Sequence, residues 1–365
     1  MVLSGCVQPF DRTRGHGRRI VGAIRAAFVF QNPRQELLAE VRAGREPDTA
    51  LLGLNHLAAF GIAADVHDPR LLRRKRGGLL ERFLWSAREV PLPWELWWAE
   101  VAFTPLANLF PLAARVHGAP PVVCVNYGLV TIYDRSSRAR QKLLARSLRS
   151  CAAVVCLGAS QREDTIERCR LAPERVHTVP VGVDIDWFAP RSEPDAEPYL
   201  LTVGKDLARD LQTLAAAVAE LDTRVEIVAH PRNLASVTLP ANARVRSFIS
   251  TAELRDLYAA AACVVVPQRA DGYPYGSEGG GLTTVCEAMA MAKPVIATER
   301  AILRDYLDED ELVPPEDPDA LRAAIERVLA DPGERGERSR RRAEQRHSTR
   351  HFAEQLAPIL RAAAT

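Results

Sequence analysis

The strongest constraint on the fold lies after residue 198, where short apolar runs alternate with longer segments of helical pattern. The runs predict strands at Tyr199–Val203, Val225–Ala229, Arg244–Phe248, Cys263–Pro267 and Val295–Thr298. The other segments predict helices at Arg209–Leu221, Thr251–Ala261, Leu282–Ala292 and Pro318–Leu329. Strands that alternate with helices form a parallel sheet covered on both faces. We therefore expect a doubly wound α/β domain, which binds its ligands at the carboxyl ends of the strands.

A second set of such runs comes earlier in the chain and predicts another α/β domain. Its expected strands are Ile24–Phe30, Ala63–Val66, Val122–Asn126 and Ala152–Leu157, and its expected helices are Gln35–Arg42 and Leu51–Phe60. Pro190–Pro198 holds three prolines among acidic and small residues, which is typical of a linker. We expect a flexible lead-in at 1–22, a first domain at 23–190, a linker at 191–198 and a second domain at 199–345. A helix at 346–365 is expected to pack back on the first domain.

Composition excludes several classes of protein. The formal net charge of +2 over 365 residues gives no overall field that favours nucleic acid, and no nucleic-acid partner is expected. No run of about 18 residues is free of charge, so a transmembrane helix is not expected. The apolar run Ile24–Phe30 leads to no small-residue cleavage site, which favours a cytoplasmic protein. Seven cysteines without C-x-x-C spacing favour reduced thiols over a zinc site or a disulfide framework.

The most informative segment is a glycine-rich loop that opens directly into a predicted helix. It reads Gly276-Ser277-Glu278-Gly279-Gly280-Gly281 and continues as Leu282-Thr283-Thr284. The start of a helix offers unpaired N–H groups and a partial positive charge, which suit a phosphate. Glu287 lies one turn after Thr283, where its carboxylate can accept hydrogen bonds from a ribose diol. The alternative is a flexible loop before a packed helix with a solvated Glu287.

Two cations follow the first strand of the second domain, in the run Gly204-Lys205-Asp206-Leu207-Ala208-Arg209. They stand at the carboxyl end of that strand, where a doubly wound domain places its ligand. Lys205 and Arg209 can therefore neutralise a diphosphate. The alternative is an exposed pair on a surface turn, the commonest place for such residues.

Together these motifs resemble those of the retaining glycosyltransferases of GT-B fold known as family 4. The resemblance is good over about residues 176 to 330 and weak in the N-terminal half. Besides Gly204, Lys205 and Arg209, it includes Pro180-Val181-Gly182-Val183-Asp184, Glu287-Ala288-Met289-Ala290 and Lys293-Pro294-Val295-Ile296-Ala297-Thr298. It implies two Rossmann-like domains that face a central cleft. It also implies transfer of a hexose-like sugar from a nucleotide-diphosphate-sugar donor to an acceptor hydroxyl, with retention of configuration.

The resemblance assigns roles to particular residues. Lys205 and Arg209 would hold the donor diphosphate, Glu287 would hold the ribose, and the Gly281–Thr284 turn would hold the phosphates. Many family members have seven residues between two glutamates, whereas here eight separate Glu278 from Glu287. Either the loop has one extra residue and Glu278 contacts the sugar, or backbone amides do so. Tyr127 stands where members often carry a histidine at the reaction centre, and a core tyrosine is the alternative.

The implied chemistry needs no cofactor and no metal. Charge that builds on the leaving diphosphate would be stabilised by the cations and the helix start. The diphosphate itself would help to deprotonate the acceptor hydroxyl on the same face. Asp184-Ile185-Asp186 matches a metal-binding D-x-D pattern, but it belongs to the Gly-Val-Asp segment, so we expect activity in EDTA. The alternatives are a degenerate GT-B protein that binds nucleotide sugar without catalysis, and a GT-B sugar-nucleotide epimerase or phosphorylase.

The acceptor is expected to bind the N-terminal half and to be a carbohydrate, a lipid-linked molecule or a small molecule. Arg70–Arg76 is basic and precedes several apolar residues, which suits peripheral contact with the inner face of an anionic membrane. A solvated basic turn before a packed helix is the alternative. Four aromatic residues are expected to pack in the core or between domains, with a sugar-stacking platform as the alternative: Trp94, Trp97, Trp98 and Phe103.

Overall fold

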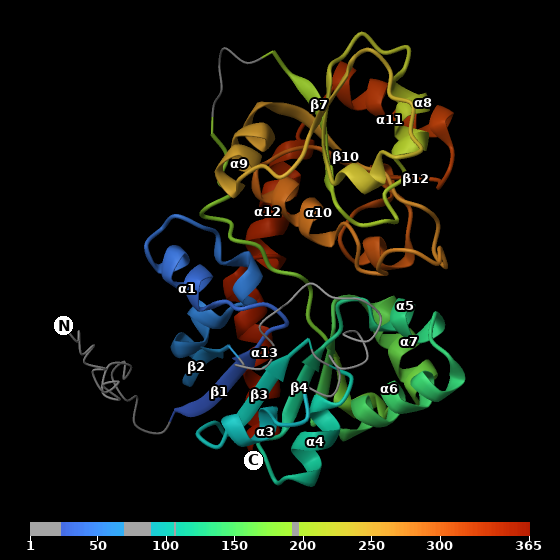
Figure 1. Ribbon diagram of the computed structural model, residues 1–365. Helices are drawn as coiled ribbons and strands as arrows, with labels where there is room; N and C mark the ends of the chain where they lie inside the picture. The colour runs from blue at the N-terminus through green and yellow to red at the C-terminus, as the bar shows by residue number, and fades with distance from the viewer. Residues whose placement is uncertain (1–22, 69–88, 106, 192–196) are drawn as a thin grey trace, which may run out of the picture.

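The computed structural model describes residues 23–68, 89–105, 107–191 and 197–365. Within these residues the chain forms two parallel sheets of six strands, one in each half, with helices around both (Figure 1). The predicted pair of Rossmann-like domains is therefore confirmed. The expected lead-in at 1–22, the basic stretch Arg70–Arg76 and most of the expected linker lie outside the described residues.

The first sheet has the strand order β2-β1-β3-β4-β5-β6. Its strands are β1 (Ile24–Val29), β2 (Ile62–His67), β3 (Val101–Thr104), β4 (Val122–Val125), β5 (Ala153–Cys156) and β6 (Val176–Thr178). The α-helices of this half are α1 (Gln35–Arg42), α3 (Leu92–Glu95), α4 (Phe110–Val116), α5 (Leu129–Asp134), α6 (Arg138–Ser150) and α7 (Ala159–Cys169). Its 3-10 helices are η1 (Asp48–Leu51), η2 (Leu54–Phe60) and η4 (Pro173–Arg175).

The second sheet has the order β12-β11-β10-β7-β8-β9. Its strands are β7 (Tyr199–Gly204), β8 (Val225–Ala229), β9 (Ala243–Arg246), β10 (Ala261–Val266), β11 (Val295–Thr298) and β12 (Leu312–Val313). Its α-helices are α8 (Leu211–Val218), α9 (Thr251–Ala260), α10 (Leu282–Ala290), α11 (Pro318–Ala330) and α12 (Arg335–Arg346), and its 3-10 helices are η5 (Pro231–Asn233), η6 (Ala301–Asp305) and η7 (Glu309–Glu311). The strand order reverses between β7 and β10. The carboxyl ends of these two central strands are therefore the expected ligand site.

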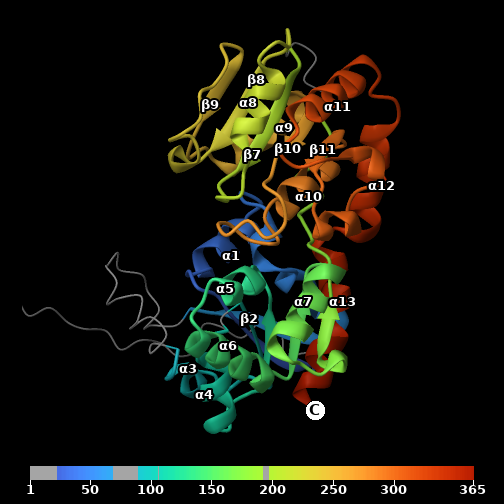
Figure 2. The ribbon, with the colours of Figure 1, turned by 90° about the vertical axis from the view of Figure 1, so that its right-hand side faces the viewer.

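The chain passes between the two halves at two places, which lie against each other. The amide of Val183 donates to the carbonyl of His347 (2.8 Å), and the amide of Thr349 donates to the carbonyl of Val183 (3.0 Å). The last helix, α13 (Thr349–Ala364), then runs down beside the first sheet (Figures 1 and 2). It packs against η2, β1, β3 and β4 with a buried apolar face.

Two expectations for the first half are wrong. The segment Leu51–Phe60 is not one α-helix but belongs to two 3-10 helices, which are separated by Leu52 and Gly53 with positive φ. The chain must turn there because Gly53 lies against α13, where a Cβ atom would meet Ala353 at 2.9 Å. The four aromatic residues also do not form one packed cluster: Phe103 is buried against Phe28 and Trp98 is half-buried, but Trp94 and Trp97 are 60% and 83% exposed.

Candidate functional site

Arg209 lies in the turn after β7, at the carboxyl edge of the second sheet. Its side chain is 7% exposed, and Nη2 donates to the carbonyl of Val203 (2.7 Å) and to Oγ1 of Thr284 (3.1 Å). Its Nε and Nη1 atoms are buried and have no hydrogen-bond partner among the described residues. Burial lowers the pKa of Arg209 to about 10, so the guanidinium remains charged at neutral pH. A buried cation with unused donors suits an anion.

Gly204 and Gly281 leave the space that this guanidinium occupies. A Cβ atom on Gly204 would lie 2.0 Å from Nε of Arg209, and one on Gly281 would lie 3.1 Å from Nη1. Gly281 also has φ +93°, a conformation that disfavours other residues, and α10 begins directly after it. The sequence-predicted donor residues Gly204, Arg209, Gly281 and Thr284 therefore lie together.

Helix α10 carries Glu287 one turn after Thr283, as predicted from the sequence. Glu287 is 9% exposed, and Oε2 accepts a hydrogen bond from the hydroxyl of Tyr258 (2.9 Å). Burial raises the pKa of Glu287 to about 7, while the tyrosine hydrogen bond opposes this rise. Thr283 is exposed on the first turn, and the Leu282 side chain is in the core, so Leu282 can meet a ligand only through its backbone.

Lys205 is exposed, and its side chain forms no hydrogen bond or ion pair within the described part of the chain. Its carbonyl accepts from Nη2 of Arg232 (2.9 Å), which places a further cation beside it. Arg209 and Arg232 both line a pocket of about 310 Å³ together with Arg269. Arg269 is paired with Asp210 (3.3 Å) and Glu316 (3.1 Å), whereas Arg209 and Arg232 have no acidic partner among the residues described. The pocket therefore suits an anion.

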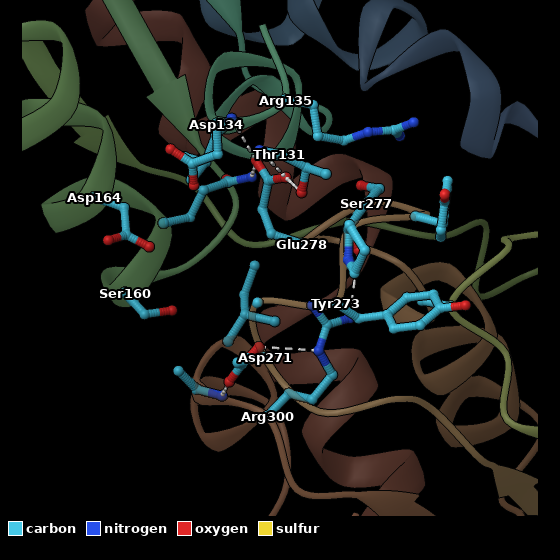
Figure 3. A pocket seen from close by; sticks show the side chains of 18 of the residues that line it. Thr131, Asp134, Arg135, Ser160, Asp164, Asp271, Tyr273, Ser277, Glu278 and Arg300 are labelled. Atoms are coloured by element: carbon cyan, nitrogen blue, oxygen red, sulfur yellow. Dashed lines mark hydrogen bonds and ion pairs between the residues drawn. The ribbon is translucent and has the colours of Figure 1, made fainter.

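Glu278 does not lie with Glu287 but contacts the first domain. Its carboxylate accepts from the backbone amides of Val130 (3.0 Å) and Thr131 (3.2 Å), which form the first turn of α5. The Thr131 hydroxyl (2.7 Å) and Nε2 of Gln161 (3.1 Å) also donate to it. These contacts are drawn in Figure 3. The carboxylate thus caps a helix of the other domain and is already occupied by four donors.

A pocket of about 420 Å³ lies between the two domains next to Glu278 (Figure 3). It is lined by residues of α5, α7 and the loop 271–278, but not by Glu287 or Thr284. Arg300 is 6% exposed and fixes that loop by bonding to Asp271 (3.0 Å) and to the carbonyl of Ser277 (3.3 Å). The acids and arginines in the wall of this pocket suit a hydroxyl-rich molecule.

Tyr127 lies at the carboxyl end of β4, where α5 begins. Its side chain is 44% exposed, and its carbonyl accepts from the hydroxyl of Ser277 (3.4 Å). It is therefore not a core tyrosine and it faces the same loop as Glu278.

The carboxylate of Asp184, in the D-x-D pattern, bonds to backbone amides. The Asp184 carboxylate accepts from the backbone amides of Asp48 (3.0 Å), Asp186 (3.2 Å) and Trp187 (2.9 Å). Burial raises the pKa of Asp184. Its oxygens thus hold the backbone of the segment that passes between the domains.

Several residues of the site were not predicted from the sequence, among them Arg232, Arg300, Gln268 and Tyr258. Gln268 is fully buried, donates to the carbonyl of Gly280 (2.6 Å) and so holds the glycine-rich loop. A polar residue directly after a predicted strand was a usable signal for it. Tyr258 gave no signal, because a tyrosine on an amphipathic helix resembles any core residue.

We expect the variant Glu278→Ala to loosen the contact between the domains. The variant removes the carboxylate that caps α5 from the other domain. Part of the binding energy of donor and acceptor must then bring the two domains together. The KM for donor and acceptor should rise about fivefold to tenfold, because a set of hydrogen bonds to one charged carboxylate is lost. Small-angle scattering of the unliganded protein should show a larger radius of gyration. Asp164→Ala is the control, because Asp164 lines the same pocket but pairs with Arg168 of its own helix. A loss of kcat as large as that of Arg209→Ala, with unchanged scattering, would instead indicate a contact with the sugar.

Two family descriptions match successive parts of the chain. "Glycosyltransferase Family 4" matches residues 39–187, and "Glycosyl transferases group 1" matches residues 197–331. A MMP α-(1→4)-mannosyltransferase of Mycolicibacterium hassiacum is 25% identical over 350 residues, which cover 88% of this chain and 72% of that protein. A D-inositol 3-phosphate glycosyltransferase of Kineococcus radiotolerans is 32% identical over 234 residues, which cover 51% of each chain. The match thus spans about half the length of this second relative.

Solved structures with the same arrangement of domains include Anabaena HepE in complex with UDP and glucose, with a TM-score of 0.67 and 14% identity. That match covers 92% of this chain and 99% of HepE. Sucrose-phosphate synthase of Thermosynechococcus elongatus has a TM-score of 0.69 and 20% identity, with 93% and 98% of the two chains covered. At these identities the likeness shows the fold. No helix in the described ranges is long and apolar enough to cross a membrane.

Proposed function

Because the chain belongs to the group 1 glycosyltransferases of GT-B fold, we propose that it transfers a sugar from a nucleotide-diphosphate-sugar to an acceptor hydroxyl, with retention of configuration. The observation that carries this proposal is the guanidinium of Arg209. It is buried between Gly204 and the first turn of α10, and two of its nitrogens lack a partner among the described residues. A donor diphosphate is an anion that can accept hydrogen bonds from these nitrogens.

The proposed donor site extends from Arg209 in two directions. Towards α10, the helix start and Thr284 meet the phosphates, and Glu287 accepts from the ribose hydroxyls. Towards β8, Arg232 lines the pocket and adds positive charge, and the exposed Lys205 lies beside Arg232, which bonds to its carbonyl. The relatives named as acting on a mannosyl group and on inositol phosphate agree with a sugar donor and a hydroxylated acceptor.

The proposed reaction takes place on one face of the sugar. The bond between the anomeric carbon and the diphosphate oxygen breaks, while the acceptor oxygen bonds to the same carbon. The acceptor proton moves to the departing diphosphate, so no protein carboxylate has to act as nucleophile. Arg209, Lys205 and the start of α10 stabilise the negative charge as it develops. The acceptor is proposed to enter from the side of α5 and Tyr127, where the two domains meet.

The test uses the purified full chain with UDP-, GDP-, ADP- and dTDP-sugars. Thermal shift identifies the donor, because a bound donor raises the apparent stability. The donor is then incubated with polyol and glycan acceptors, and NMR of the product gives the anomeric configuration. Conversion of donor without acceptor would indicate an epimerase. Binding without any transfer would indicate a protein that binds nucleotide sugar only, and inversion would exclude the proposed mechanism.

We predict that transfer is unchanged by an excess of EDTA. The D-x-D segment is used for backbone hydrogen bonds of Asp184, and a second acidic group is neutralised by arginines. In that group, Arg338 pairs with Asp310 (2.9 Å) and Arg342 pairs with Glu311 (2.8 Å). Initial rates with and without EDTA provide the measurement. A loss of rate that added Mg²⁺ or Mn²⁺ restores would contradict the prediction.

A further inference from the structure

A buried tyrosine of another helix holds the carboxylate of Glu287. Tyr258 belongs to α9, is fully buried, and its hydroxyl donates to Oε2 of Glu287 (2.9 Å). No other hydrogen bond to this carboxylate is made by the residues that the structure describes, so Oε1 is left for a ligand. One oxygen is therefore fixed by the protein and the other is unused.

The position of Tyr258 is fixed from several sides. The start of α9 has a capping box, in which Ser250 and Glu253 bond to each other's backbone amides. The ring of Tyr258 packs edge-on against Phe188, with centroids 6.0 Å apart and an interplanar angle of 88°. Phe188 belongs to the segment that joins the two domains. The ring is thus held by α9 and by the segment that joins the two domains, and not only by its hydrogen bond to α10.

We propose that Tyr258 is a positioning residue for donor binding, whose hydroxyl orients Glu287 so that Oε1 accepts the hydrogen bonds of a ribose diol. This inference rests on the proposed function, because it takes Glu287 as the ribose ligand. Tyr258 acts through Glu287 and does not itself touch the donor.

The groups around Glu287 make the pH dependence of ribonucleotide binding a test of this role. Tyr258 approaches it from α9, Arg209 is near through Thr284, and Cys286 is its neighbour on α10. Burial raises the pKa of Glu287 to about 7, and the Tyr258 hydrogen bond stabilises the ionised form and so lowers this pKa. Burial also raises the pKa of Tyr258 well above its usual value, so the hydroxyl keeps its proton. Removal of that hydroxyl must therefore raise the pKa of Glu287.

The test is Tyr258→Phe, with binding of UDP, GDP and ADP and of their 2′-deoxy counterparts measured by calorimetry on both sides of neutral pH. At neutral pH we expect the variant to bind the ribonucleotide that fits the wild-type protein about tenfold more weakly. Affinity for the 2′-deoxy compound should change little. The pH at which ribonucleotide affinity is half-maximal should move upward, because more Glu287 is protonated at a given pH.

Tyr199→Phe is the matched control. Tyr199 is also a buried tyrosine. Its hydroxyl donates to the carbonyl of Leu257 (2.8 Å), which belongs to α9 as Tyr258 does, and not to Glu287. It should lower the melting temperature about as much as Tyr258→Phe, yet keep the wild-type pH profile and ribose preference. The same loss of preference in both variants would reduce Tyr258 to a structural residue.

Glu287→Gln separates the inference from the function on which it rests. If this variant loses the preference for ribose but Tyr258→Phe keeps it with an unchanged pH profile, the role of Tyr258 is refuted and the donor site stands. If Glu287→Gln also keeps the preference, Glu287 is not the ribose ligand, and the proposed arrangement of the donor is refuted with it.

Discussion

Arg209→Ala should lower kcat about 10²- to 10³-fold, the loss that follows removal of a single donor to a developing negative charge. Arg209 is placed for such a role because its guanidinium is buried, remains charged and has two nitrogens without a protein partner in the described residues. The variant removes these donors from the diphosphate when its charge increases, so kcat should fall more than donor affinity. Single-turnover rates and calorimetric titration of the nucleoside diphosphate measure the two effects separately.

Two further variants make this result specific to Arg209. Arg209→Lys keeps the charge but loses the planar guanidinium, whose Nη2 bonds to both Val203 and Thr284, so an intermediate rate is expected. Arg322→Ala removes an arginine that bonds to the carbonyls of Ala216 and Ala217 and to Glu220, far along the chain from the site residues. Its rate should equal that of the wild type. If Arg209→Ala retains both turnover and nucleotide affinity, the diphosphate is not bound there.

The fold could be predicted from the sequence wherever the pattern was strong. The strand at Val225–Ala229 is present as predicted, and helix α1 has the predicted bounds, because a run of β-branched residues or an amphipathic turn decides such segments locally. The strands β6 and β12 were missed because they have three and two residues, too few to show a period, and β3 was missed as well. The 3-10 geometry around Gly53 depends on α13, which is some 300 residues later in the chain, so no local pattern could reveal it.

The parts of the site that follow directly from strand ends could be predicted from the sequence. Gly204, Arg209, Gly281 and Thr284 lie together because two loops follow neighbouring parallel strands, β7 and β10, and so end at one edge. Glu278 was not predictable in the same way. Its spacing from Glu287 gave only the choice between a sugar contact and backbone amides. The structure adds an alternative that needs the first domain, because the donors to Glu278 come from α5 and α7. Contacts between domains leave no period in the sequence.

Gly182→Ala should be among the most destabilising single substitutions in the chain, because the two passages between the domains touch at this residue. A Cβ atom on Gly182 would lie 2.5 Å from the carbonyl oxygen of Ser348 and 2.9 Å from Cα of Thr349. These are backbone atoms, held by the hydrogen bonds of Val183 to His347 and of Thr349 to Val183, so they cannot move aside as a flexible side chain would. Overpacking of a rigid site costs about 1–3 kcal/mol and occasionally more.

Gly182→Ala should lower the rate of sugar transfer as well as the melting temperature. The backbone amide of Val181, next to Gly182, donates to the hydroxyl oxygen of Tyr306 (2.9 Å), and Tyr306 stacks on His347 with ring centroids 4.8 Å apart. Displacement of these segments changes how the two domains face each other, so sugar transfer should fall together with stability. Gly118→Ala is the control: its φ of +63° makes alanine strained, but no atom lies within 4 Å of the added Cβ, so only about 1 kcal/mol is expected. A Gly182→Ala protein that melts no lower than Gly118→Ala and keeps wild-type turnover would show that the two passages can move apart at this residue without cost.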